Sequence, residues 1–97
     1  MTAVNEMTKV LSSAMQASGT AAPANMYLSC ARVYVTVYGP KLRTVKAAAK
    51  RLGIRWTHRG IYVGYDNASG REYMRGEAIA AALSAAGVNA YQHTDED

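Results

Sequence analysis

The chain has 97 residues, a formal net charge of +4 and one cysteine. This length suits a single domain, one cysteine excludes an internal disulfide, and no apolar run is long enough to span a bilayer. The first residues lack the basic and apolar regions of a secretory signal. We therefore expect a cytoplasmic protein whose positive charge favours anionic partners.

The first predicted element is an amphipathic helix in the N-terminal segment, residues 1–18. Its stripe of apolar and small residues recurs every three or four positions, at Val4, Met7, Leu11, Ala14 and Ser18. This spacing predicts one helix over residues 4–18. Glycine and proline interrupt the pattern afterwards, so residues 19–31 are predicted as a linker and lead-in. The stripe leaves three roles open: a cover over a sheet, a homodimer contact, or a helix that docks on a partner.

The next element is a strand over residues 33–38 whose two sides differ in chemistry. Its residues alternate strictly, with Val33, Val35 and Val37 on one side and Tyr34, Thr36 and Tyr38 on the other. Successive side chains on a strand point to opposite faces. The valines therefore predict a buried side, and the tyrosines predict a partly solvent-exposed side because each ring carries a hydroxyl.

A helix is predicted after Pro40, which suits a first helical position, and Gly53 is its C-cap candidate. The predicted inner face of this helix consists of Leu42, Val45, Ala49 and Leu52.

Lysines and arginines on and after this helix form a predicted basic cluster: Lys41, Arg43, Lys46, Lys50, Arg51, Arg55 and Arg59. From Met7 to Tyr65 the chain holds nine Lys and Arg and no Asp or Glu. A solvated helix ordinarily mixes both signs, so we predict that these cations bind a partner. Unopposed cations suit phosphates, and they suit an acidic protein groove equally well.

Two arrangements fit the chain between residues 54 and 75. Residues 54–65 have an extended pattern, with Gly60 as a bend or bulge. We favour a hairpin of residues 61–66 and 71–75 around an Asn-Ala-Ser-Gly turn. The alternative has a tight turn at Arg59-Gly60 and begins the next helix near Arg71. Both arrangements continue with a helix over 77–86, a strand over 88–93 and a solvated acidic tail, residues 94–97.

Without the first helix, the predicted order is strand, helix, strand, strand, helix, strand. This is the split βαβ, ferredoxin-like plan of the α+β class, in which an antiparallel sheet carries both helices on one face. We expect it to form a single domain over residues 32–93, with the N-terminal helix as an addition. The helices would cover the valine side of the first strand and leave its tyrosines on the other face.

This architecture resembles that of RNA-recognition motifs, which stack bases on aromatic residues of a four-stranded sheet. Tyr34, Tyr38 and Tyr62 are the predicted stacking residues here, and Tyr91 could join them from the last strand. The resemblance is limited to the architecture. The third strand of that family carries aromatics two residues apart, whereas Tyr62 and Tyr65 are three apart and are predicted on opposite faces.

A catalytic or metal site is not predicted. Residues 60–62 (Gly-Ile-Tyr) followed by 73–75 (Tyr-Met-Arg) resemble the opening hairpin of GIY-YIG nucleases, but Arg75 stands where that motif has glycine. His58 and His93 each lack a second ligand at metal spacing, and no glycine-rich phosphate loop occurs. We expect a protein that is not an enzyme and uses no cofactor.

These patterns favour a small binding protein, with two hypotheses for its partner. In the first, the basic, tyrosine-rich surface binds nucleic acid through phosphate contacts and base stacking. In the second, the same surface binds protein, because tyrosine and arginine are enriched in interface hot spots. An inhibitor or adaptor of this second kind would dock on a nucleic-acid-handling or defence complex, as compact phage inhibitors do.

Overall fold

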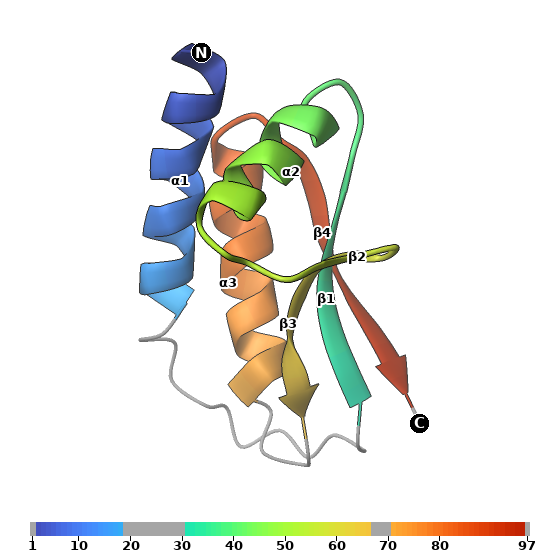
Figure 1. Ribbon diagram of the computed structural model, residues 1–97. Helices are drawn as coiled ribbons and strands as arrows, with labels where there is room; N and C mark the ends of the chain where they lie inside the picture. The colour runs from blue at the N-terminus through green and yellow to red at the C-terminus, as the bar shows by residue number, and fades with distance from the viewer. Residues whose placement is uncertain (1, 19–30, 67–70, 97) are drawn as a thin grey trace.

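The computed structural model describes residues 2–18, 31–66 and 71–96 (Figure 1). The elements of this part of the chain are α1 (Thr2–Ser18), β1 (Ala31–Tyr38), α2 (Leu42–Arg51), β2 (Trp56–Thr57), β3 (Gly60–Asp66), α3 (Arg71–Ala85) and β4 (Asn89–Glu96). None of these helices combines the length and the apolar character needed to cross a membrane.

The strands form one antiparallel sheet in the order β2-β3-β1-β4. Figure 1 shows α1, α2 and α3 on one side of this sheet. The α+β class and the antiparallel sheet are therefore confirmed, and the arrangement is compatible with a ferredoxin-like plan. The strand at the β2 edge has only two residues, so the sheet is narrow at that edge.

The valine side of β1 is the centre of the core. Val33 and Val35 are fully buried and Val37 nearly so, which confirms the alternation predicted for this strand. Ile79 and Leu83 of α3 are buried with them, because a stripe at helical spacing faces the sheet.

The helix α1 packs against α2 and α3. Its stripe is buried within a single copy of the chain, and Met7 and Leu11 belong to the same apolar cluster as Val35 and Leu83. Figure 1 shows α3 between α1 and the sheet. The role of α1 is none of the three left open by the sequence: it covers the other two helices and not the sheet. No helix of the described residues lies over the tyrosine side of the sheet.

The hairpin favoured over residues 61–66 and 71–75 is wrong. The alternative is confirmed in its helix start at Arg71 and in its tight turn, which lies one residue earlier than predicted, at residues 58 and 59. A two-residue turn connects Thr57 to Gly60, whose φ of +107° is open only to glycine without strain. Residues 71–75 instead begin α3, where Glu72 in the first turn suits the helix dipole and pairs with Arg75 at 2.9 Å. The predicted turn at 67–70 lies outside the described residues.

Two further expectations need correction. The last strand, β4, continues to Glu96 and pairs with β1 as far as Ala31, so residues 94–96 belong to the sheet rather than to a solvated tail. On α2 the inner face consists of Val45, Ala48 and Ala49, whereas Leu42 and Leu52 remain 36% and 38% exposed. Leu42 is the first residue of α2 and Leu52 is its C-cap, so both lie outside the buried middle of the helix.

Candidate functional site

The side of the sheet away from the helices carries five tyrosines and is called the tyrosine face below. They are Tyr34 and Tyr38 of β1, Tyr62 and Tyr65 of β3, and Tyr91 of β4. The strand register places them together, because residues opposite each other in an antiparallel pair share a face. Tyr34 is opposite both Tyr62 and His93, and Tyr91 is opposite Thr36.

A β-bulge brings Tyr65 onto this face, although its spacing from Tyr62 predicts opposite faces. The register between β1 and β3 shifts at Val33 and Tyr34, so one residue of β3, Val63, is extra. Val63 packs against the core, and a Cβ on Gly64 would meet the side chain of Glu72 on α3. Both residues thus point toward the helices, and the two tyrosines on either side of them point away.

The tyrosines differ greatly in how much of each ring solvent reaches. Tyr38 and Tyr91 are 53% and 51% exposed and form a pair with ring centroids 6.0 Å apart. Tyr65 is 45% exposed. Tyr34, a predicted stacking residue, is only 7% exposed because Tyr62 and His93 pack beside it, at centroid distances of 5.6 and 6.3 Å.

Two arginines of the predicted basic cluster belong to the tyrosine face. The guanidinium carbon of Arg55 lies 4.9 Å from the centre of the Tyr62 ring, a cation–π contact. Arg59 Nε forms an ion pair with Asp95 at 3.0 Å, and its Nη1 donates to Nε2 of His93 at 3.2 Å. Arg59 is therefore held on the sheet by its own neighbours, and Arg55 remains open to a partner.

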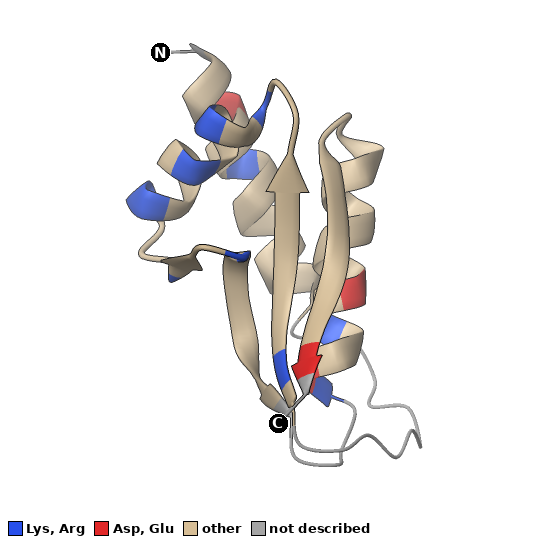
Figure 2. Ribbon diagram, turned by 90° about the vertical axis from the view of Figure 1, so that its right-hand side faces the viewer, with Lys and Arg blue, Asp and Glu red and all other residues tan. Residues whose placement is uncertain are grey.

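The remaining cations of the cluster lie on α2 or at its N-cap. Two of them lie at the ends of the helix, and the other three line a hollow on one side of it. Arg51 Nη1 donates to Asn5 Oδ1 of α1 at 2.5 Å, and Lys41 occupies the N-cap position. Arg43, Lys46 and Lys50 are exposed and line a hollow beside Ile54 and Trp56. Figure 2 shows the basic residues of α2 and of the following loop at one edge of the sheet, while acidic residues lie on α1, α3 and β4. The three hollow-lining cations have no ion pair with the described part of the chain.

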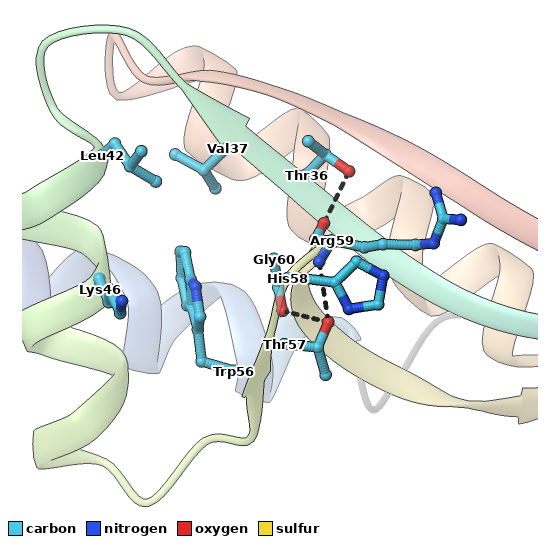
Figure 3. Close-up of a pocket in the computed structure, with 9 residues that line it drawn as sticks. All are labelled: Thr36, Val37, Leu42, Lys46, Trp56, Thr57, His58, Arg59 and Gly60. Carbon is cyan, nitrogen blue, oxygen red and sulfur yellow. Dashed lines mark hydrogen bonds between the residues drawn. The ribbon is translucent and has the colours of Figure 1, made fainter.

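A second hollow, called the Trp56 hollow below, connects α2 to the tyrosine face (Figure 3). Its volume is about 530 Å³, and its walls come from the end of β1, the start of α2 and the β2–β3 hairpin. The lining residues are Thr36, Val37, Leu42, Lys46 and residues 56–60. Trp56 and Lys46 line both hollows, so the two hollows lie side by side.

Sequence reasoning missed Trp56 and Tyr65 as surface residues. The signal for Trp56 was available, since it is the only tryptophan and it lies within the acid-free stretch of the chain. The signal for Tyr65 was weaker, because only Gly64 hints at the bulge that turns it.

In the described residues no three His, Cys, Asp or Glu side chains come together as metal ligands would. Comparison of the chain with models of known protein families, with curated proteins and with solved structures found no match. Any functional conclusion therefore depends on the geometry and charge of these surfaces.

Proposed function

We propose that this protein is a non-enzymatic, ferredoxin-like module that binds single-stranded nucleic acid. The observation that carries the proposal is the half-exposed Tyr38–Tyr91 pair, which stands at the end of β1 from which the chain enters the cationic helix α2. Nucleic acid combines flat rings with a line of negative charges, and this surface presents aromatic rings next to a line of positive charges.

The cations of α2 support phosphate contacts. Arg43, Lys46 and Lys50 follow one another at three- and four-residue spacing, which places them along one side of the helix. The first turn of α2 contains no acidic residue and begins with Lys41 at the N-cap, although a helix N-terminus favours negative charge. A phosphate near this helix would offset that unfavourable electrostatic arrangement.

The aromatic rings support contacts with unpaired bases. Base stacking on an aromatic side chain contributes about 1–3 kcal/mol per base and tolerates every base. Tyr38, Tyr91 and Tyr65 are the rings with enough exposed area, and the guanidinium of Arg55 offers a further flat surface above Tyr62. Bases in a duplex are stacked on each other, so this surface favours single strands.

The test is the affinity of a fluorescent single-stranded oligonucleotide, measured by anisotropy at several salt concentrations. Tyr91→Ala should weaken binding about tenfold through the lost stacking. Lys46→Gln combined with Lys50→Gln should reduce the slope of log affinity against log salt by about 0.7 for each lost phosphate contact. Lys9→Gln removes one lysine charge from an exposed site on α1 and is the control for each of the two single substitutions, Lys46→Gln and Lys50→Gln.

Absence of binding to both single- and double-stranded probes at low salt would contradict the proposal. Binding that does not change with salt would contradict it as well. Recovery of a defined protein complex that Tyr91→Ala disrupts, together with either result, would favour the inhibitor or adaptor hypothesis instead.

A further inference from the structure

The Trp56 hollow has apolar walls on one side and a polar rim on the other. In Figure 3 the indole ring of Trp56 stands between Lys46 and the hairpin turn, with Leu42 and Val37 above it. Leu42, 36% exposed, forms part of the apolar wall of the hollow. The volume of about 530 Å³ lies within the range of ordinary small-molecule sites, roughly 300–1,000 Å³.

Most polar groups of the hollow already have partners within the hairpin. Thr36 Oγ1 donates to the carbonyl oxygen of Arg59 at 2.8 Å. Thr57 Oγ1 accepts from the Arg59 amide at 3.1 Å and donates to the Gly60 carbonyl at 3.2 Å. This wall is therefore preformed, and its hydrogen bonds need no ligand to complete them.

The ionisable side chains that remain for a ligand are those of Lys46 and His58. Within the described residues neither makes a hydrogen bond or an ion pair. No carboxylate lines the hollow, and the guanidinium of Arg59 points away from it toward the sheet (Figure 3). A ligand that fits needs an apolar flat part for Trp56 and Leu42 and an anionic part for Lys46.

We propose that the Trp56 hollow holds one nucleotide of the bound strand, with its base against Trp56 and Leu42 and its phosphate on Lys46. This inference rests on the proposed function and adds the site at which one base of the bound strand turns into the protein. The neighbouring hollow contains Arg43 and Lys50 and shares Lys46 and Trp56, so the next phosphates have cations along the same helix. Charge complementarity thus favours a nucleotide over a neutral aromatic ligand.

Trp56 is the only tryptophan in the chain, so its fluorescence reports on the Trp56 hollow and on the neighbouring hollow that it also lines. Leu42 lines only the Trp56 hollow, so a variant at Leu42 assigns the signal. Titration with unlabelled oligothymidylate should quench Trp56 emission and saturate together with the anisotropy of the labelled strand. Inorganic polyphosphate, which has the charge but no base, should leave the emission nearly unchanged, with free tryptophan amide as the optical control.

A matched pair of variants distinguishes binding in the Trp56 hollow from a general effect of net charge on strand binding. Leu42→Asp places a carboxylate at the mouth of the hollow, and the first turn of a helix accepts an acidic residue favourably. It should abolish the quenching and weaken strand binding about tenfold or more, because the base loses its apolar wall and the new carboxylate repels the phosphate held nearby on Lys46. Leu52→Asp changes the same residue type at the other end of α2, with the same net charge and nearly equal exposure, and should retain the quenching.

The outcomes distinguish this inference from the proposed function. If the oligonucleotide binds by anisotropy but Trp56 emission stays constant at saturation, the inference fails and the function survives. Equal quenching by polyphosphate, or equal loss in both Asp variants, would also overturn it. If no strand binds but an acidic, tyrosine-containing peptide quenches Trp56, both proposals fail and the hollow belongs to a protein partner.

Discussion

Tyr34 differs from the other residues of the tyrosine face in being 7% exposed. The alternation along β1 correctly predicts the face on which it lies, but not its depth, because burial depends on Tyr62 and His93 from two other strands. We expect Tyr34→Ala to lower the free energy of unfolding by about 3 kcal/mol through the cavity it leaves. Tyr91→Ala, at a half-exposed ring on the same face, should change it by less than about 1 kcal/mol.

Urea unfolding of both variants measures this difference. A fully stable Tyr34→Ala protein that no longer binds nucleic acid would show instead that Tyr34 is a contact residue. Comparing the two variants therefore shows whether Tyr34 supports the fold of the tyrosine face or contacts a partner directly.

Tyr73 gives a prediction for alkaline pH. A hydrogen bond to Glu77, one turn further along α3, raises the pKa of the Tyr73 phenol above its ordinary value of 10.0, and the negative charge of Glu77 and burial act in the same direction. The folded state therefore holds this proton more tightly than the unfolded chain does. The resulting stabilisation is complete below the ordinary pKa and is lost as the pH rises through the raised one.

An NMR titration of the tyrosine rings should show Tyr73 ionising above the ordinary pKa. Glu77→Ala should bring the Tyr73 pKa back toward the ordinary value, because both the acceptor and the charge are removed. An unchanged Tyr73 titration in that variant would contradict the assigned cause.

The β2–β3 hairpin is the element that joins the two candidate surfaces, and Gly60 is the residue that permits it. A Cβ at this position would lie 2.3 Å from the Val35 carbonyl oxygen and 3.0 Å from the Thr36 Cα, both of them backbone atoms that cannot turn aside. With its φ of +107°, Gly60→Ala should cost about 3 kcal/mol of stability. It should also distort the Trp56 hollow, because residues 56–60 form one wall.

Gly53→Ala is the control for this prediction. Gly53 also has a positive φ, +70°, but no atom lies within 4 Å of the added Cβ. Its cost should be only the conformational one, about 1 kcal/mol. If urea unfolding gives equal losses of stability for both variants, backbone strain alone, and not the close approach to β1, explains why position 60 requires glycine.

Elements whose apolar residues repeat at the spacing of a helix or a strand were predictable from the sequence. Elements that exist only because two strands pair were not. The stripe of α1 and the valines of β1 repeat at the spacing of their own structure. The two-residue β2 and the bulge at Val63 have no such period, since each exists only through pairing with a neighbouring strand. The candidate site was therefore predictable in its cations and in part of its tyrosines, whereas the hollow, which needs three elements together, was not.

On the scale of the whole molecule, the question is whether α1 and the elements that carry the candidate surfaces unfold together as one cooperative unit. Leu11 is fully buried and shares its apolar cluster with Val45 of α2, Leu83 of α3 and Ile61 of β3. A helix that only docked on a partner would leave this position exposed. Instead, α1 fills the space along both other helices and so holds α2, with its cations, in place.

Leu11→Ala should therefore destabilise the entire chain by about 3 kcal/mol, in a single unfolding transition. Trp56 emission follows this transition although Trp56 is not on α1, so a shift of its urea midpoint reports on the common core. Lys9→Ala, at an exposed position two residues away, should leave the midpoint within about 0.5 kcal/mol of the original stability. If Leu11→Ala melts α1 by circular dichroism while the Trp56 transition stays where it was, α1 is a separate unit, and the placement of the α2 cations does not depend on it.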